Sequence, residues 1–220
     1  MTGKTHPLAP SLAPLVAILL VSPPALGSPS DPIDVVKFKY QEITSVVDRN
    51  PERAAMDKGI REVLDTFVDY RELSRRTLAD HWEGLKRKQQ GDFVDVFKLM
   101  IQRSYVRKFN PNKQVRIEYR GGTTFAPDGT ATVSTVVHSG KSEARVDYLF
   151  HRLGGAKKDD ALKDAGKDTS KDTSWWSFDV VIDDVSMVKN YRKQFHDIWD
   201  KEGFDGLMKR IRKKNAASAE

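Results

Sequence analysis

Two aspartates beside aromatic residues are the side chains of this sequence best suited to acid–base chemistry. Asp147 precedes Tyr148, and Asp179 follows Phe178, in two segments where polar and apolar residues alternate. A carboxylate and a phenol beside a cavity could exchange protons with a bound substrate. However, neighbouring side chains of a β-strand point to opposite faces of the sheet. We therefore expect both carboxylates on the outer face of a sheet, solvated or paired with arginine.

The other residue types that could perform chemistry show no catalytic or metal-binding spacing. The chain has five histidines and no cysteine, and neither H-x-x-x-H nor H-E-x-x-H occurs, so no zinc-type ligand set is predicted. Neither a G-x-S-x-G turn nor a glycine-rich nucleotide loop occurs. We expect no metal, no cofactor and no covalent catalysis.

A strand that leads directly into an amphipathic helix is the clearest structural signal. Residues 176–183 alternate with a period of two, and the apolar residues after them recur every three or four positions. A sheet followed by a helix with this much aromatic bulk must cover something apolar. The apolar positions of this segment are Phe178, Val180 and Ile182 in the strand and Met187, Tyr191 and Phe195 in the helix.

Similar periodicities divide the rest of the chain into helices, then strands, then helices. The predicted helices cover about 33–48, 52–66, 70–79, 88–108, 185–200 and 204–213. The predicted strands cover 115–119, 133–137, 146–150 and 176–183. Short strands that follow one another closely pair in antiparallel fashion. The order predicts an α+β fold, with an antiparallel sheet of about four strands and several helices packed on one face.

The helix at 88–108 carries an apolar stripe that allows two interpretations. Its members are Phe93, Phe97, Met100, Ile101 and Tyr105. Spacing alone favours an ordinary core for such a stripe. The same side chains could instead line an apolar cavity, because only the separation of the backbones decides between the two.

Two ordered blocks of this sequence resemble a known family. The first block is W-x-x-F-D-V-x-I-x-x-V-S over 175–186, followed by Y-R-x-Q-F over 191–195. The second runs from Phe67 through Leu73, His81-Trp82 and Phe97 to Tyr105. Both resemble the MlaC/toluene-tolerance family of periplasmic phospholipid-binding proteins, over roughly residues 35–210. The sequence departs from the family pattern at Asp80 and Asp184, near positions where glycine is usual, and we expect the turn at Asp184 to be kept because aspartate tolerates turn conformations.

The resemblance implies a fold that encloses an apolar lipid cavity. It also implies a soluble phospholipid carrier that moves lipid between an outer-membrane lipoprotein complex and an inner-membrane ABC transporter with an MCE-domain subunit, and so maintains outer-membrane lipid asymmetry. The alternatives are a carrier of another amphiphile, such as a hopanoid or an organic solvent, and an isomerase-like enzyme of the nuclear-transport-factor-like fold. The residues that the resemblance and the apolar faces assign to lipid binding are Phe67, Phe93, Phe97, Met100, Ile101, Tyr105, Ile117, Tyr119, Val146, Tyr148, Phe150, Phe178, Val180, Ile182, Met187, Tyr191 and Phe195.

The ends of the chain and one internal segment differ in composition from the rest. Residues 1–27 read as a cleavable export signal, with Lys4, a short apolar stretch and the small residues Ala25-Leu26-Gly27. Residues 28–220 are then expected to form a single lipid-binding domain in the periplasm. It would carry a polar, flexible insertion at about 154–174, where Lys-Asp-Thr-Ser occurs twice. The formal net charge of +6 favours anionic lipid or acidic partners, and export argues against nucleic acid.

Overall fold

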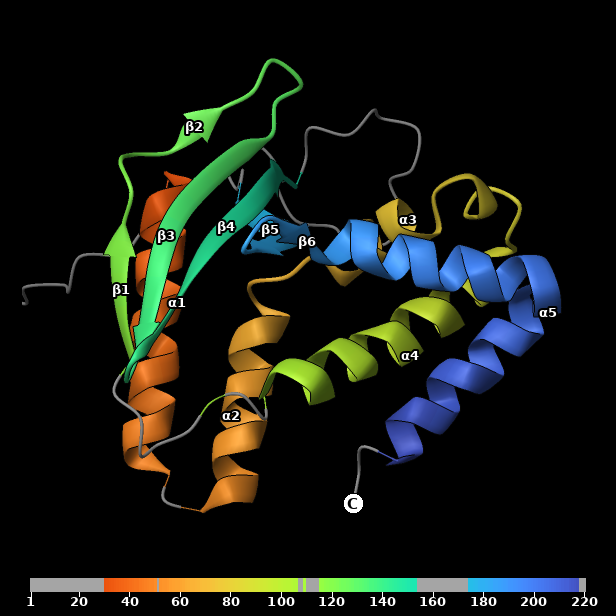
Figure 1. Cartoon of the computed structure of the whole chain (residues 1–220), viewed down its shortest axis with the longest axis horizontal. Coiled ribbons are helices and arrows are strands. Elements are labelled where there is room, and N and C mark those ends of the chain that lie inside the picture. Colours follow the sequence, from red (N-terminus) through yellow and green to blue (C-terminus); the bar gives the residue numbers. More distant parts are fainter. Residues whose placement is uncertain (1–29, 51, 107–108, 110–114, 154–173, 218–220) are drawn as a thin grey trace, which may run out of the picture.

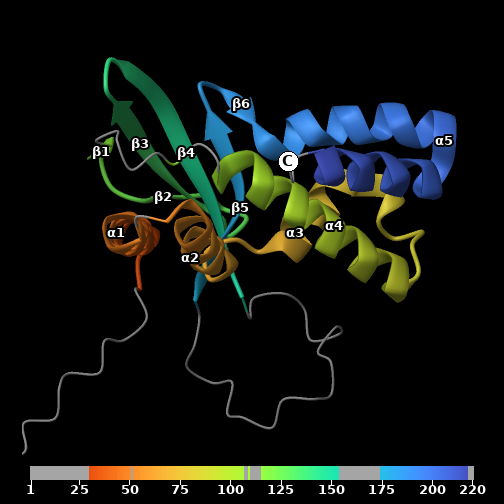
Figure 2. The same cartoon turned by 90° about the horizontal axis from the view of Figure 1, so that it is seen from below.

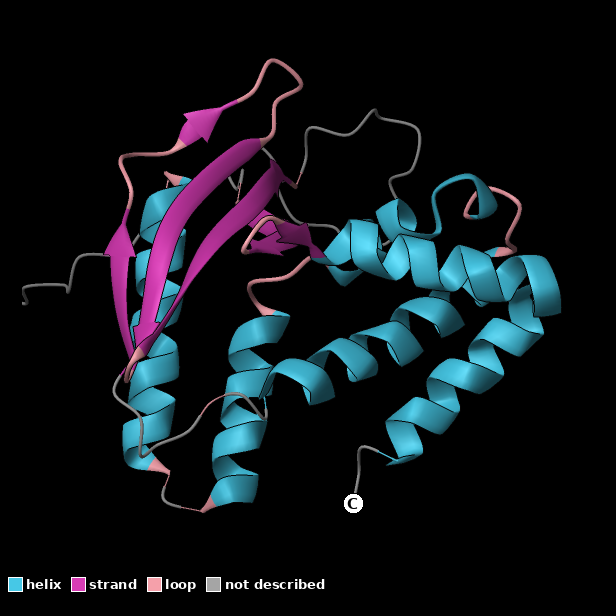
Figure 3. Cartoon of the chain, in the orientation of Figure 1, coloured by secondary structure: helices cyan, strands magenta, loops and turns pink. Residues whose placement is uncertain are grey.

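Five α-helices and one antiparallel sheet make up the described part of the chain (Figures 1 and 3). The computed structural model describes residues 30–50, 52–106, 109, 115–153 and 174–217. The predicted export signal and nearly all of the predicted insertion lie outside these residues. No helix in the described ranges has the length and apolarity needed to cross a membrane.

The helices begin and end close to the positions that the sequence periodicity indicates. They are α1 (Pro32–Arg49), α2 (Arg53–Asp65), α3 (Tyr70–Leu78), α4 (Arg87–Val106) and α5 (Met187–Ala217), with a short 3-10 helix at Ala79–His81 after α3. Asp31 caps α1 by accepting a hydrogen bond from the Ile33 N–H at 3.0 Å. Gly203 has a positive φ of 65° and breaks α5 into two helical segments, at the gap between the two helices predicted there.

Within the described residues the sheet has six strands, of which two are only two residues long. They are β1 (Val115–Tyr119), β2 (Thr124–Phe125), β3 (Ala131–Ser139), β4 (Ser142–Arg152), β5 (Trp175–Ile182) and β6 (Val185–Ser186). The strand order is β1-β3-β4-β5-β6, and β2 extends the β1 edge by pairing with β3. The α+β class is confirmed. The expected number of about four strands is too low, because β2 and β6 are too short to show an alternating pattern.

A β-bulge in β5 changes which side chains share a face. Tyr148 pairs with Val180, and Phe150 pairs with Ser177, so the register shifts between Leu149 and Phe150. Phe178 is the extra residue, and it leaves the face that carries Val180. The predicted alternation, which placed Phe178 on one face with Val180 and Ile182, is therefore wrong at this position.

The turn between β5 and β6 keeps its shape without glycine. Asp183 and Asp184 have φ values of 47° and 67°, and they connect the paired residues Ile182 and Val185. Two positive φ values are the geometry of a type I′ hairpin turn. Arg145 on β4 holds the turn, because its N–H donates to Asp183 Oδ1 at 2.9 Å and its guanidinium contacts Asp184 at 2.5 Å. The expectation that aspartate preserves this turn is confirmed.

The described residues form three apolar cores: a small one between α2 and α4, around Met56 and Ile60, and two larger ones on either side of a gap. One is aromatic and lies among α3, α4 and α5, which extend beyond the β5–β6 edge of the sheet (Figure 2). The other lies between α1 and the sheet, around Phe150, Val133 and Trp175. Because neither core fills the space between the inner face of the sheet and α2 and α4, a cavity remains there.

Candidate functional site

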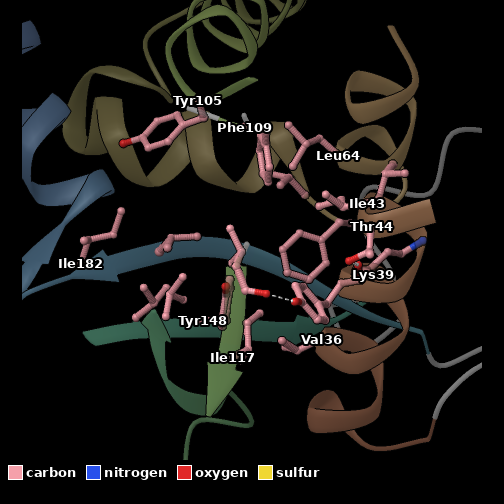
Figure 4. Close-up of a pocket in the computed structure, with 18 of the residues that line it drawn as sticks. Val36, Lys39, Ile43, Thr44, Leu64, Tyr105, Phe109, Ile117, Tyr148 and Ile182 are labelled. Carbon is pink, nitrogen blue, oxygen red and sulfur yellow. Dashed lines mark hydrogen bonds between the residues drawn. The ribbon is translucent and has the colours of Figure 1, made fainter. Parts of the chain in front are cut away.

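A cavity of about 770 Å³ lies between the inner face of the sheet and the helices (Figure 4). Its volume falls within the range of about 300–1,000 Å³ that is typical of sites for small ligands. The walls come from α1, α2, α4, four strands of the sheet and the first residues of α3 and α5. The site is therefore assembled from segments that are far apart in the sequence.

The sheet supplies one wall through alternate residues of neighbouring strands. Val146 and Tyr148 of β4 lie opposite Ile182 and Val180 of β5 in the strand register. Ile117 of β1 continues this wall toward the edge of the sheet. Since residues paired across antiparallel strands share a face, the register places all five side chains toward the helices.

The opposite wall is an apolar stripe of α1. Val36, Tyr40, Ile43 and Val47 follow one another at helical spacing, and all four line the cavity. The Tyr40 hydroxyl donates a hydrogen bond to the Val115 carbonyl at 2.5 Å. This bond attaches the middle of α1 to the β1 edge strand and holds the two walls together.

The helical end of the cavity is closed by α2, α4 and the first residue of α5. Leu64 comes from α2, Ile101 and Tyr105 come from α4, and Met187 begins α5. Phe109, which follows α4, lies beside Leu64 in this wall (Figure 4). The apolar lining therefore continues from the sheet onto the helices.

Polar groups gather at the α1 side of the cavity. The Lys39 ammonium is 2.8 Å from Glu42 Oε2 and donates to Thr66 Oγ1 at 2.9 Å. Thr44 and Asp48 follow Lys39 further along the helix, and both are exposed. The cavity thus has apolar walls and a wetted rim that carries charges of both signs.

Tyr105 and Tyr148, which lie in the walls, carry no charge at neutral pH. Burial raises the pKa of Tyr148 to about 12, and the pKa of Tyr105 is also raised to about 12, first by burial and then by nearby Tyr191 and Asp179. A neutral phenol adds little electrostatic cost to the entry of an apolar group. The walls are therefore suited to a hydrocarbon guest.

The predicted lipid-binding residues divide into two groups in the structure. Those that line the cavity are Phe67, Ile101, Tyr105, Ile117, Val146, Tyr148, Val180, Ile182 and Met187. Those that lie outside its lining are Phe93, Phe97, Met100, Tyr119, Phe150, Phe178, Tyr191 and Phe195. Direct contact with a ligand remains a prediction for the first group.

Aromatic packing explains why several members of the second group lie elsewhere. The Phe97 ring is 5.1 Å from the Phe195 ring and 5.2 Å from the Tyr191 ring, so Phe97 packs in the aromatic core. Along the apolar stripe of α4, the first residue that lines the cavity is Ile101. Phe150 packs against Phe67 at 5.8 Å in the second core. Both sets of rings fill the cores that flank the cavity.

The bulge accounts for the position of Phe178. Its ring lies under the guanidinium of Arg76, 3.8 Å from the carbon of that group, and 5.8 Å from the imidazole of His151. Phe178 therefore packs between α3 and β4, away from the cavity. The alternation of the sequence does not reveal a bulge.

Sequence reasoning missed the largest contribution to the lining, which comes from α1. The lining residues of α1 are Val36, Lys39, Tyr40, Ile43, Thr44, Val47 and Asp48. The stripe of four apolar residues was visible as a helical pattern, but it contains no phenylalanine or tryptophan that would mark it as a site. The helical spacing of these apolar residues was the only signal that the sequence offered for this wall.

The two aspartates that suggested acid–base chemistry both lie outside the cavity lining. Asp179 is only 5% exposed, which corrects the expectation that it is solvated or paired with arginine. Its Oδ2 accepts the Ser186 hydroxyl at 2.6 Å, and its Oδ1 accepts the Val188 N–H at 3.0 Å. The carboxylate is thus used to cap α5. Among the described residues, no group of three or more acidic or histidine side chains could hold a metal ion.

Comparisons with known proteins agree with this architecture. A comparison with the curated proteins found no match. Among solved structures, the fold is similar to that of the phospholipid-binding protein from Ralstonia solanacearum in complex with a phospholipid. The two share 18% sequence identity and a TM-score of 0.71, over 87% of this chain and 100% of the other. The family model for MlaC protein matches residues 39–159 and 167–213. Because this match covers most of the sequence, the chain belongs to the MlaC family.

Proposed function

We propose that this protein is a carrier that binds a phospholipid with its acyl chains in the cavity and its headgroup at the rim beside α1. The observation that carries the proposal is the cavity of about 770 Å³, with apolar walls formed by the sheet, α1 and α4. The polar side chains of Lys39, Thr44 and Asp48 line the α1 side of the cavity, and the headgroup would lie beside them. The solved structure with the same fold is described as a complex with a phospholipid, which supports this class of ligand.

The driving force for binding would be the transfer of acyl chains from water to an apolar site. Each buried methylene contributes about 0.8 kcal/mol, and the uncharged phenols of Tyr105 and Tyr148 do not oppose this transfer. The carrier would bind and release its ligand without covalent chemistry. Because an acyl chain is so poorly soluble in water, release would require a partner that offers an equally dry binding site.

We further propose that the protein works in the periplasm. There it would shuttle phospholipid between an outer-membrane lipoprotein complex and an inner-membrane ABC transporter with an MCE-domain subunit. Membership of the MlaC family supports this role. So does the export signal that residues 1–27 resemble. A carrier of this kind contributes to the lipid asymmetry of the outer membrane.

Mass spectrometry of lipid extracted from purified protein tests the proposal. The protein should be isolated from the periplasm of the expressing cells, beside the Val180→Trp variant. Val180 is half-buried in the sheet wall, so an indole there should fill the cavity while the surface of the fold stays unchanged. We expect diacyl phospholipid near one equivalent in the wild type and a loss of at least tenfold in the variant.

Two results would contradict the proposal. The first is a folded wild-type protein whose extracts contain a hopanoid, a solvent or no lipid. The second is equal phospholipid in the wild type and the variant, which would place the lipid outside the cavity. A variant with wild-type circular dichroism serves as the control for folding.

A further inference from the structure

The outer face of the second segment of α5 carries an unusual concentration of positive charge. Between Lys201 and Lys214 the chain has six basic and two acidic residues. This segment therefore carries a net charge of +4, whereas the whole chain carries a formal net charge of +6. Lys209, Arg212 and Lys213 are all exposed. Together these three residues form what we call the basic stripe.

The helix presents the basic stripe to solvent because its opposite face is fixed in the core. Leu207, Met208 and Ile211 are at most 3% exposed. The Asn215 side chain donates to the Val96 carbonyl of α4 at 2.9 Å, and the Arg103 guanidinium of α4 donates to the Asn215 carbonyl. At 3.6 residues per turn, Lys209 and Lys213 follow each other along the side of the helix away from these contacts. The orientation of the stripe is therefore set by packing.

Internal ion pairs do not account for the basic stripe. Arg210 is held by Glu202, with Nε 3.0 Å from Oε2, and Lys214 lies over the Tyr191 ring at 5.9 Å. Within the described part of the chain, the three stripe residues form no hydrogen bond or ion pair through their side chains. The helix dipole favours cations only in the last turn of a helix. It therefore does not explain why a lysine stands at position 209.

We propose that the basic stripe is a docking surface for an anionic lipid bilayer. Clusters of lysine and arginine bind such membranes through additive attraction to the surface charge. An interface for a protein partner usually centres on exposed aromatic or apolar residues and is depleted of lysine. The exposed large apolar residues in the described structure are Phe38, Leu99, Val115, Phe125, Leu153 and Val185, and α5 contains none of them. This composition fits adsorption to a charged surface better than a packed protein interface.

The position of the stripe gives docking a consequence for the cavity. Arg103, which holds the end of α5, lies between the cavity-lining residues Ile101 and Tyr105 on α4. Docking through the stripe would hold the bilayer against the far side of α5, one helix away from this end of the cavity wall. That consequence rests on the proposed function, whereas the adsorption itself does not.

Vesicle flotation with the mature chain tests the inference. The vesicles would contain either phosphatidylcholine alone or phosphatidylcholine with phosphatidylglycerol, at low and at high salt. The stripe variant is Lys209→Gln, Arg212→Gln and Lys213→Gln. The control is Lys37→Gln, Lys58→Gln and Lys141→Gln, which removes the same charge from α1, α2 and the β3–β4 turn. We expect binding only to anionic vesicles at low salt, a decrease of more than about tenfold for the stripe variant, and near wild-type binding for the control.

Three outcomes would overturn the inference. The first is a wild type that does not float with anionic vesicles, which includes the case where the stripe binds an acidic protein instead. The second is an equal loss of binding in the stripe and control variants, which would attribute the effect to net charge alone. Finally, Val180→Trp should still float. If this variant does not float, the vesicles are held through the cavity and not through the stripe. If it floats although it carries no phospholipid, adsorption to the vesicle is independent of lipid binding in the cavity, so the two proposals can fail separately.

Discussion

The carboxylate of Asp179 in β5 accepts a hydrogen bond from the backbone N–H of Val188 in α5, with Oδ1 and N 3.0 Å apart. The other oxygen of the same carboxylate accepts the Ser186 hydroxyl, and the Ser186 oxygen in turn accepts the Lys189 N–H at 3.0 Å. One buried side chain thus satisfies a free N–H of the first turn of α5 and positions the serine that satisfies another. The D-V-x-I-x-x-V-S motif therefore links strand β5 of the cavity wall to the start of α5 through hydrogen bonds.

Removal of this cap should destabilise the protein. For Asp179→Ala we expect a loss of about 1–3 kcal/mol, because a helix cap and a buried hydrogen-bond acceptor disappear together. Urea denaturation followed by circular dichroism measures the change. The control is Asp147→Ala on the adjacent strand, which should stay within about 0.5 kcal/mol of the wild type. Equal effects of the two substitutions would contradict the capping role.

Substitution of Ala79 by glycine should stabilise the protein. Ala79 ends α3 with a φ of 47° and a ψ of −118°, a conformation that glycine adopts without the steric cost of a Cβ. We expect Ala79→Gly to raise the free energy of unfolding by about 1 kcal/mol. Ala55→Gly, on the exposed face of α2, is the matched control and should lower it by up to about 1 kcal/mol. Destabilisation by both substitutions would show that Ala79 is not strained.

Phe97 should behave as a core residue and not as a ligand contact. It is fully buried among Phe93, Tyr191 and Phe195, so Phe97→Ala should cost about 3–5 kcal/mol. Variants that remain folded should retain phospholipid. Ile182→Ala in the cavity wall is the comparison, with a smaller loss of stability and weaker lipid retention. Lipid loss at Phe97→Ala without destabilisation would place this ring in the binding site.

The stability of the protein should depend on the ionisation of Glu72 in acid. Burial alone would raise the pKa of this carboxyl group, but hydrogen bonds from Arg75 and Arg76 lower it to about 2. Since the pKa in the folded state lies below the value of about 4.3 for an unfolded chain, the contribution is complete above that pH and is lost as the pH falls toward 2. We expect Glu72→Gln to be less stable near pH 7 by on the order of 2 kcal/mol.

The pH dependence of that difference is the decisive measurement. Between pH 5 and pH 2, the gap between Glu72→Gln and the wild type should shrink, because the wild-type carboxylate becomes protonated. Thermal unfolding at intervals of pH measures both proteins. A gap that stays constant down to pH 2 would attribute the effect to packing and not to charge.

The sequence predicted the helices and strands better than it predicted which residues line the cavity. The alternation of Val146, Tyr148 and Phe150 correctly identified the inner face of β4, and Gly203 falls at the predicted break between two helices. Local periodicity is sufficient for such features. The bulge at Phe178 depends on pairing with a partner strand, and no local pattern encodes it. Whether Phe97 or Ile101 meets a cavity depends on helix separation, which is likewise a property of the assembled chain.

The attachments of α1 have a consequence for the order in which the chain becomes compact. Its Ile33 N–H donates to Thr123 Oγ1 at 3.2 Å, Tyr40 donates to the Val115 carbonyl, and Trp175 Nε1 donates to the Ser30 carbonyl at 3.1 Å. Each partner is synthesised at least 75 residues after the group that it holds. During synthesis the apolar stripe of α1 must wait for the strands that cover it, and contacts of such long sequence separation form slowly. The stripe that would face a lipid in the mature protein is therefore exposed on the nascent chain until those strands are made, and exposed apolar surface of this kind favours binding by a chaperone.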